Sequence, residues 1–451
     1  MIAGARDDGE SLACWRYLAP APGRVLAVHG ELSEAHRRAL QETFEVIVSA
    51  RDPLASAADG NLILPGAPVP AAHSGWKVRL HRHAAIGASH VVLPTLEAPR
   101  WFLPTRAIGS GLKLVTSSRP LVRRAIQLAA HRGVAPALRV LGGSVTLHAP
   151  EGSNGLVPYG HRLACSTGTR SALRKATLLE LDAHGREVAY GKIAGRSLAL
   201  EDIDAEARWL DRIAALGLTS VEVPRLLRTA SFGRERAVFQ SPPDASSAFT
   251  SWSGGLSERV IAVLVELRER TRVPGGSASG FVHEVTARFD ELSPHLPAAR
   301  RARIAAAMSC LEHDLGVDAL SWAHGDFIDW NLKGDQAGRR LFLFDWEHAV
   351  SDAPPFFDFI HWVVFSHYLV GRGRSAFAEL VAPGGPFGEA RRQVEQALGL
   401  QLEARHVRLY ALRACLLHSR GWRAGYEDVR ERHEPTLAFL LPLLEVRERF
   451  A

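Results

Sequence analysis

The chain has 451 residues, of which 47% are hydrophobic and 23% charged, and its formal net charge is +6. This length predicts two or three compact domains, and the composition excludes disordered and fibrous proteins. No stretch approaches the roughly eighteen uninterrupted apolar residues of a membrane helix, and the N-terminus lacks the apolar core of a secretory signal. We therefore expect a cytoplasmic protein that has no membrane partner. Four scattered cysteines without a CxxC spacing argue against a disulfide framework or a cysteine-based zinc site.

Residues 1–98 predict a small α/β unit. The apolar stretch 24–30 is typical of a strand, residues 32–44 have apolar side chains at helical spacing, and residues 45–50 predict a second strand. Residues 99–155 are expected to connect this unit to the next one, with strands at "WFLPT" and "LKLVTSS" and then a basic helix. No chemistry is assigned to either region.

Two features of these regions resemble ligand sites, and both have simpler interpretations. His81, His83 and His90 lie close together in sequence, but their spacing matches no metal signature, so we interpret them as structural or surface residues. The basic run that begins at Arg119 carries enough charge to contact nucleic acid. A solvated helix face is the better explanation, and no nucleic-acid partner is expected.

Residues 156–243 predict a small antiparallel sheet domain. Three strands joined by short turns come first, a helix follows at 200–216, and two further strands end at a proline-rich break near Pro242. Residues 244–451 have mostly helical periodicity. The sequence therefore predicts a small sheet domain joined to a larger helical one.

The stretch "WAHGDFIDWNLKGD", Trp322 to Asp335, concentrates polar residues in the helical region. It lies between the apolar runs "ALSWA" and "RRLFLFDWE", which indicates a loop between strands. Asp326 and Asn331 are five residues apart, and Asp345 ends the second apolar run. Two carboxylates and an amide oxygen are the hard ligands that Mg²⁺ prefers, and a carboxylate that binds no metal can accept a proton from an attacking hydroxyl. The pattern indicates phosphoryl transfer.

The sheet domain offers groups that could bind a nucleotide. Lys192 lies in the third strand, and Glu206 lies in the helix after it, where an ion pair would fix the ammonium group. The turn "STGTR", from Ser166 to Arg170, could present backbone N–H groups and hydroxyls to phosphates. Each feature alone is usually structural, and their order along the chain makes the combination more specific.

The motifs "HGDFIDWN" and "LFLFDWE" resemble those of the aminoglycoside phosphotransferase and choline kinase family. That family has the pattern HGDxxxxN followed by a strand that ends in Asp, often within DWE, and the resemblance covers roughly residues 159–451. It implies an α+β chain with a two-lobed protein-kinase-like fold. The small antiparallel sheet lobe would be 156–243 and the larger helical lobe 244–451, both preceded by the N-terminal α/β extension.

The resemblance also implies roles for individual residues. Asp326 would be the catalytic base, and Asn331 and Asp345 would bind magnesium. Lys192 would hold the α- and β-phosphates of ATP and pair with Glu206. The resemblance thus implies ATP and Mg²⁺ as cofactors, and Asp358 would brace the catalytic loop. The remaining nucleotide-binding residues are expected in the phosphate loop and in the hinge "FQSPPD" that would receive adenine: Ser166, Thr167, Gly168, Thr169, Phe239 and Ser241.

Some positions depart from the family's pattern and leave the acceptor open. Asp329 stands where relatives often have proline, and the phosphate loop has a single glycine. The segment from Gly371 onward has slightly more Arg than acidic residues, which disfavours a polycationic aminoglycoside. Trp330 and other aromatics could form a cage for a choline-like substrate, but aromatics at helical spacing are more often core. The expected partner is a small molecule with a hydroxyl group: a sugar, an aminoglycoside-like or choline-like compound, or another metabolite.

A catalytically inactive, nucleotide-binding or scaffold protein is the alternative interpretation. In that case the first 155 residues would be the part that contacts a partner. The retention of Asp326, Asn331, Asp345 and Lys192 argues against it, because a decayed kinase is expected to lose at least one of these groups.

Overall fold

The computed structural model of the chain divides into two compact units. The first comprises Met1–Ile203 with Leu226–Pro242, and the second comprises Asp204–Arg225 with Pro243–Ala451. The division differs from the predicted boundaries, because residues 1–155 share a unit with the predicted sheet lobe. The structure describes residues 13–18, 25–41, 44, 46–49, 51, 60–65, 67, 76–82, 85, 88–94, 99–114, 143–148, 156–158, 160–168, 173–244, 249–274, 280–316, 318–335, 338–368 and 377–447.

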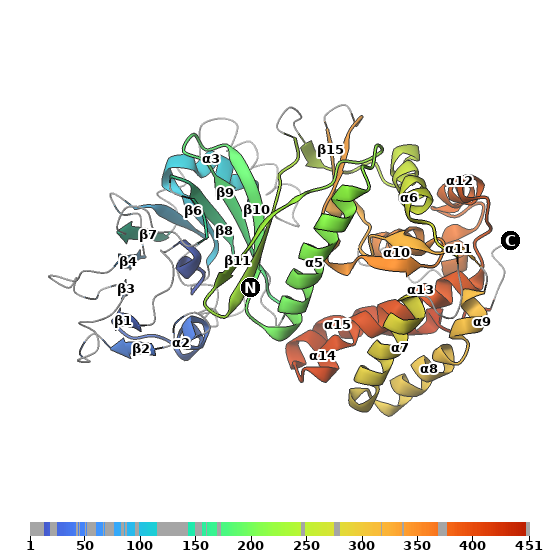
Figure 1. Ribbon diagram of the computed structural model, residues 1–451. Coiled ribbons are helices and arrows are strands. Elements are labelled where there is room, and N and C mark those ends of the chain that lie inside the picture. The colour runs from blue at the N-terminus through green and yellow to red at the C-terminus, as the bar shows by residue number, and fades with distance from the viewer. Residues whose placement is uncertain are drawn as a thin grey trace. The chain divides into compact units, whose positions relative to one another are not determined.

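A twelve-stranded sheet runs through the first unit in the order β11-β12-β10-β9-β8-β6-β5-β7-β4-β3-β1-β2 (Figure 1). Strands β2, β1, β3 and β4 pair in parallel, and the described pairs in the rest of the sheet are antiparallel. The strands are β1 (Val25–His29), β2 (Val46–Ser49), β3 (Gly60–Ile63), β4 (Trp76–His81), β5 (His90–Pro94), β6 (Pro99–Pro104), β7 (Gly143–His148), β8 (Arg162–Ser166), β9 (Ala176–Leu181), β10 (Glu187–Ala194), β11 (Leu226–Phe232) and β12 (Glu235–Gln240).

The N-terminal region and the predicted sheet lobe meet where β6 pairs with β8. Trp101 is opposite Ser166, and Phe102 is opposite Cys165, so a single ladder continues across the predicted boundary. Successive side chains of these strands point to opposite faces of the sheet. The edge strand β11 is an example, because its exposed and half-buried residues alternate until the buried Phe232.

The 3-10 helix η1 (Ala13–Leu18) anchors the start of the described chain against this sheet. The Arg16 guanidinium donates to both carboxylate oxygens of Glu235, from Nη2 at 2.7 Å and from Nε at 3.1 Å. The Tyr17 hydroxyl donates to the same carboxylate at 2.6 Å. All three side chains are buried, so η1 is attached to β12 by a desolvated ion pair.

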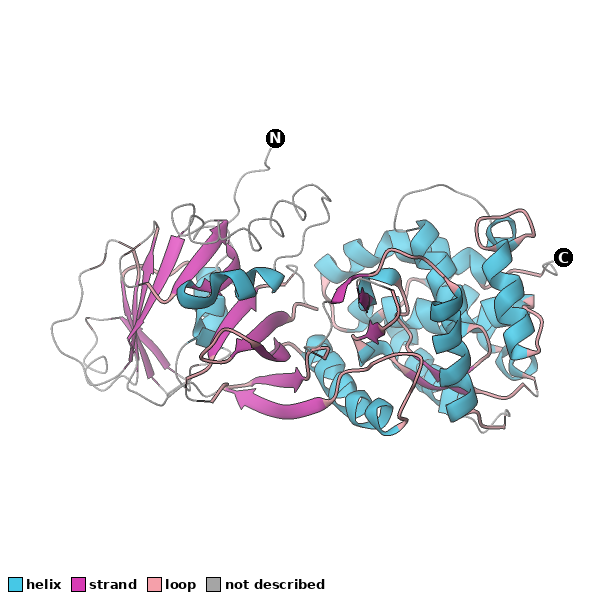
Figure 2. Ribbon diagram, turned by 90° about the horizontal axis from the view of Figure 1, so that it is seen from above, coloured by secondary structure: helices cyan, strands magenta, loops and turns pink. Residues whose placement is uncertain are grey.

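The second unit is mostly helical (Figure 2). Helix α5 (Ser197–Ala215) begins in the first unit, and its residues from Asp204 onward belong to the second unit. Short strands form a three-stranded sheet, β13-β15-β16, and a pair, β14-β17: β13 (Phe249–Ser251), β14 (Ser321–Ala323), β15 (Leu332–Asp335), β16 (Leu341–Leu343) and β17 (Val350–Ala353). The other helices are α6 (Glu258–Thr271), α7 (Gly280–Leu292), α8 (Ala298–Met308), α9 (Leu311–Leu315), α10 (Phe357–Tyr368), α11 (Phe377–Val381), α12 (Gly388–Leu398), α13 (Ala404–His418), α14 (Arg420–Arg423) and α15 (Glu427–Leu443).

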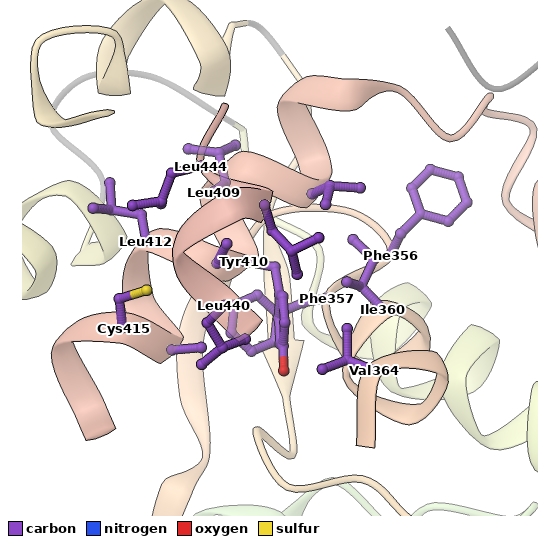
Figure 3. Close-up of a cluster of buried hydrophobic side chains, with 14 of the residues drawn as sticks. Phe356, Phe357, Ile360, Val364, Leu409, Tyr410, Leu412, Cys415, Leu440 and Leu444 are labelled. Carbon is purple, nitrogen blue, oxygen red and sulfur yellow. The ribbon is translucent and has the colours of Figure 1, made fainter. Parts of the chain in front are cut away.

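The core of this unit lies around α10 and α13. Helix α13 is buried on nearly all sides, since every residue from Leu409 to Leu417 is buried. A helix that is apolar all round is expected in the interior of a large domain. Figure 3 shows Tyr410 packed among apolar side chains of α10, α13 and α15, including Phe357 and Ile360. This core holds α10 in place beneath the polar loop that follows β14.

Several predicted elements differ from the structure. The stretch "LKLVTSS" was expected to be a strand, but Leu112–Leu114 is a 3-10 helix, and the rest of the stretch lies outside the described residues. The predicted basic helix also lies outside them. The long helical patterns at 298–316 and 404–426 are each interrupted, the first between α8 and α9 and the second between α13 and α14. Within the described part of the chain, no helix combines the length and apolarity that crossing a membrane requires.

Candidate active site

The loop between β14 and β15 is shaped by Gly325 and Asp358. Gly325 has φ of +78°, and a Cβ built there would lie 2.0 Å from the backbone oxygen of His348, so only glycine fits. The Asp358 carboxylate accepts hydrogen bonds from the backbone N–H groups of His324 at 2.7 Å and of Gly325 at 2.9 Å. Burial raises the pKa of Asp358 to about 6 despite these bonds. The expectation that Asp358 braces this loop is confirmed.

His324 contributes to the shape of the loop through backbone contacts. Its Nε2 lies 3.0 Å from the backbone oxygen of Phe344, and its Nδ1 accepts from the N–H of Asp326 at 3.3 Å. The side chain is fully buried, and burial lowers the pKa of His324 to about 4. The imidazole is therefore neutral at physiological pH, with Nε2 protonated and donating to Phe344.

Asp326 and Asn331 contact each other directly. The Asn331 amide nitrogen donates to Oδ2 of Asp326 and to its backbone oxygen, each at 2.8 Å. Since the amide nitrogen is used by Asp326, the amide oxygen is the atom of Asn331 with which a metal could be held. The 3-10 helix η7 (Asp329–Asn331) brings the two residues together across the tight loop.

The second oxygen of Asp326 is bonded to His361 of helix α10. Nε2 of His361 lies 3.0 Å from Oδ1, and Nδ1 of His361 lies 3.1 Å from the Tyr410 hydroxyl. Burial raises the pKa of Asp326, but the hydrogen bond with His361 outweighs burial, so the pKa lies below its ordinary value. The side chain of Asp326 is 25% exposed. It is thus an ionised carboxylate with both oxygens hydrogen-bonded and a face open to a ligand.

Asp345 lies at the end of the strand β16 with φ of +74°, a conformation that few residues other than glycine adopt. Its carboxylate, that of Glu206 and that of Glu347 each have an oxygen within 4.8 Å of the others. The backbone N–H of Phe344, just before Asp345, donates to the backbone oxygen of Asn331 at 3.1 Å, which connects this strand to the loop. Oxygen donors are the ligands of Mg²⁺, so this group fits a hard divalent cation.

Asp329, the extra carboxylate of the motif, is half-buried. Burial raises the pKa of Asp329, while the backbone N–H of Trp330 lowers it by hydrogen bonding. These contacts are local to η7, and we assign Asp329 no chemical role.

The predicted phosphate loop differs from expectation at Thr167. This residue is fully buried, and its N–H donates to the Arg100 oxygen at 2.9 Å while its hydroxyl donates to the Pro99 oxygen at 3.2 Å. Both donors therefore extend the ladder to β6 and are not available to phosphates. Ser166 ends β8, and Gly168 turns with φ of +70°, where a Cβ would lie 2.2 Å from the Lys175 oxygen. Thr169 and Arg170 lie outside the described residues.

Two of the predicted nucleotide-binding residues lie near the end of β12. The Phe239 side chain is fully buried, and a Cβ on Gly191 would lie 2.7 Å from its ring, so this side chain belongs to the core of the sheet. Ser241 follows β12 directly and is half-buried. The Phe239 side chain is therefore not available to adenine, and the hinge at Phe239 and Ser241 stays a prediction.

Lys192 lies in the middle of β10 and is half-buried, between two buried neighbours, Gly191 and Ile193. It belongs to the first unit, whereas Glu206, Asp326, Asn331 and Asp345 belong to the second. The ion pair between Lys192 and Glu206 stays a prediction.

The sequence alone did not indicate three residues of this site. His361 and Tyr410 are 35 and 84 residues from Asp326, and nothing in the local pattern links them to it. Glu347 is part of the quoted motif "FDWE", and its acidic side chain two residues after Asp345 was the available signal.

Comparisons with known proteins give structural likenesses only. No protein-family model matches the sequence, and no curated protein matches it. The structure is similar to an aminoglycoside phosphotransferase from Streptomyces rimosus in complex with ADP and streptomycin, with 15% identity and a TM-score of 0.37 over 54% of this chain and 90% of that one. It is similar to a choline kinase from Streptococcus pneumoniae, with 14% identity and a TM-score of 0.36 over 59% and 89%. A spectinomycin phosphotransferase in complex with ADP and spectinomycin has 9% identity and a TM-score of 0.33 over 63% and 88%. At these TM-scores the likeness assigns no function. A function has to be argued from the residues of the site described above.

Proposed function

We propose that this protein is an ATP- and Mg²⁺-dependent phosphotransferase that transfers the γ-phosphate to a hydroxyl of a small molecule. The observation that carries the proposal is the loop after β14, where Asn331 and His361 each donate to one oxygen of Asp326. A carboxylate fixed in this way, ionised and partly exposed, suits an acceptor hydroxyl that must be oriented for attack.

Asp326 would accept a hydrogen bond from the acceptor hydroxyl and take its proton as the bond to phosphorus forms. Phosphoryl transfer leaves little covalent chemistry to the protein, so positioning and charge stabilisation dominate. The lowered pKa of Asp326 keeps it ionised, and its weak basicity is consistent with a proton that leaves the hydroxyl late in the reaction.

Asn331 and Asp345 would hold Mg²⁺ through the amide oxygen and a carboxylate, and Glu206 and Glu347 lie near enough to Asp345 to contribute. When bound, the ion would neutralise charge on the phosphates. Lys192, Ser166, Gly168 and Thr169 would contact the phosphates, and the backbone at Phe239 and Ser241 would receive adenine. Thr167 is left out of this set because β6 uses both of its donors.

The solved structures that resemble this chain are named as an aminoglycoside phosphotransferase, a spectinomycin phosphotransferase and a choline kinase, and a likeness this low does not identify the acceptor. The alternative remains an inactive, nucleotide-binding or scaffold protein with the same fold. The two functions differ in turnover: the enzyme consumes ATP faster when its acceptor is present, whereas the scaffold binds ATP without consuming it.

The proposal is tested by ATP consumption with Mg²⁺ across a panel of sugars, aminoglycosides, choline-like amines and other hydroxylated metabolites. Wild type is expected to consume ATP faster with at least one class of acceptor, and Asp326→Ala is expected to abolish the acceptor-dependent part. ATP binding without turnover for any acceptor, in wild type and Asp326→Ala alike, would favour the scaffold.

A further inference from the structure

His361 contacts the candidate catalytic carboxylate from the opposite side to Asn331. It lies in α10, three residues after Asp358, and its side chain is 7% exposed. Resting on the proposed function, we infer that His361, held by Tyr410, is a positioning residue that sets the orientation of the Asp326 carboxylate toward the acceptor hydroxyl.

The direction of the hydrogen bonds follows from the chemistry of the partners. An ionised carboxylate only accepts, so the proton between His361 and Asp326 is on Nε2. We assign the other ring nitrogen, Nδ1, as the acceptor of the Tyr410 hydroxyl, which lies 3.1 Å away. Burial raises the pKa of Tyr410 far above its ordinary value, so its hydroxyl remains a donor. One ordered chain of donors therefore runs from Tyr410 through His361 to Asp326.

The environment of His361 limits its movement. Its ring stacks on Phe365, with centroids 4.4 Å apart and planes 11° apart. Tyr410 packs edge-on against Phe357 at 5.1 Å, within the apolar cluster of Figure 3. Because the two rings sit on rigid, buried helices, the Nε2–H group is fixed in direction before any ligand binds.

The two histidines near Asp326 serve different purposes. His324 uses its Nε2 for the backbone oxygen of Phe344 and so shapes the loop. The ring nitrogens of His361 contact a side-chain hydroxyl and the Asp326 carboxylate. With Asn331 on Oδ2 and His361 on Oδ1, each carboxylate oxygen of Asp326 has a hydrogen-bond donor, and the two bonds together oppose rotation of the carboxylate. A misplacement of about 1 Å in such a group costs about 100-fold in rate.

The test compares His361→Leu, which removes the donor, with His361→Gln, whose amide nitrogen can replace Nε2–H. Turnover of MgATP is measured with the best acceptor of the panel and with water as the acceptor. His361→Leu is expected to lower kcat about 100-fold with KM for MgATP within about twofold, because the nucleotide site is untouched. His361→Gln is expected to recover most of the loss.

Tyr410→Phe removes only the hydroxyl that orients His361 and provides a second variant should His361→Leu fail to fold. A smaller loss of kcat, about tenfold, is expected for it, again without a change in KM. Thermal unfolding of each variant serves as the control for general destabilisation. A kcat equal to wild type in both His361→Leu and Tyr410→Phe overturns the positioning role.

A spectroscopic measurement tests the geometry without turnover. In wild type labelled with ¹⁵N at histidine, the resonances of His361, assigned with His361→Gln, should report protonated Nε2 and unprotonated Nδ1. Asp326→Ala should shift the Nε2 resonance, and Tyr410→Phe should shift that of Nδ1. The opposite tautomer in wild type overturns the inference. If wild type has this tautomer but no acceptor of the panel supports ATP turnover, the proposed function is overturned, and the positioning role with it. If wild type is active and the variants are as active as wild type, the positioning role alone is overturned.

Discussion

At the scale of single residues, Gly325 is a position at which the backbone allows only glycine. An added Cβ would meet the His348 backbone oxygen at 2.0 Å, and a shift of the Gly325 backbone would disturb its hydrogen bond to Asp358. We expect Gly325→Ala to lose nearly all activity and to destabilise the second unit well beyond the roughly 1–2 kcal/mol of a left-handed residue.

Gly399→Ala is the matched control for this prediction. Gly399 has φ of +64° at the end of α12, and nothing lies within 4 Å of its added Cβ. It should lose only about 1 kcal/mol by denaturant unfolding and keep its activity. Similar losses in the two variants would contradict the steric argument at Gly325.

His90 gives a prediction about pH. It is buried, with Nε2 3.0 Å from the Leu163 oxygen, in agreement with the structural role expected from the sequence, and burial lowers the pKa of His90 to about 4. Above a pH of about 6.5, the pKa of His90 in the unfolded chain, the imidazole is neutral in both the folded and the unfolded state, and its contribution to the free energy of unfolding is fully present. As pH falls from 6.5 to 4 only the unfolded state gains the proton, so this group should lose about 3 kcal/mol of stability. Unfolding of wild type and His90→Gln across this range should show a difference that shrinks toward low pH; a constant difference would refute it.

At the scale of elements, α10 connects the apolar core to the catalytic loop through Asp358. Asparagine at this position keeps one acceptor oxygen for two buried N–H groups, so one of them is left facing an amide donor. We expect Asp358→Asn to lose about 1–3 kcal/mol of unfolding free energy and a large part of the activity.

Asp352→Asn is the matched control, since this carboxylate accepts a hydrogen bond from the backbone N–H of Gly280, at 2.9 Å, at an exposed site. An asparagine oxygen can replace it. Chemical unfolding should detect little change, and equal losses in Asp358→Asn and Asp352→Asn would mean that the loop does not depend on α10.

The elements also indicate how far sequence reasoning reaches. The three antiparallel strands, the amphipathic α5 and the loop with Asp326 and Asn331 follow from local periodicity and short motifs, and the structure contains them. The pairing of β6 with β8 depends on register between distant strands, and the contact of His361 with Asp326 depends on helix packing. Neither leaves a local pattern. Thr167 was misread because a turn that could bind phosphate can equally continue a sheet.

At the scale of the whole molecule, the N-terminal region is part of the first unit rather than an appendage. Arg16 and Glu235 are both buried, and removal of one partner from a buried pair costs about 3–5 kcal/mol. Glu235→Gln should therefore lower the melting temperature markedly.

A triple variant, Arg16→Met with Tyr17→Phe and Glu235→Met, replaces the hydrogen-bonded cluster by apolar side chains and should be close to wild type in stability. A Glu235→Gln protein as stable as wild type would show that η1 does not hold the sheet. The pair thus tests whether residues 13–18 belong to the folded unit that carries Lys192.

The central claim is that Asp326 supports phosphate transfer to a hydroxyl. The direct measurement uses ATP labelled with ¹⁸O in the γ-phosphate and follows the label into the acceptor by mass spectrometry for wild type, Asp326→Asn and Asp335→Asn. Asp335 is a carboxylate of the same motif that caps a turn at the Arg339 N–H, so its variant should stay within about twofold of wild type. Asp326→Asn should transfer label about 10²–10⁴ times more slowly. Equal transfer by wild type and Asp326→Asn, or no labelled acceptor with any of the three, would contradict the account.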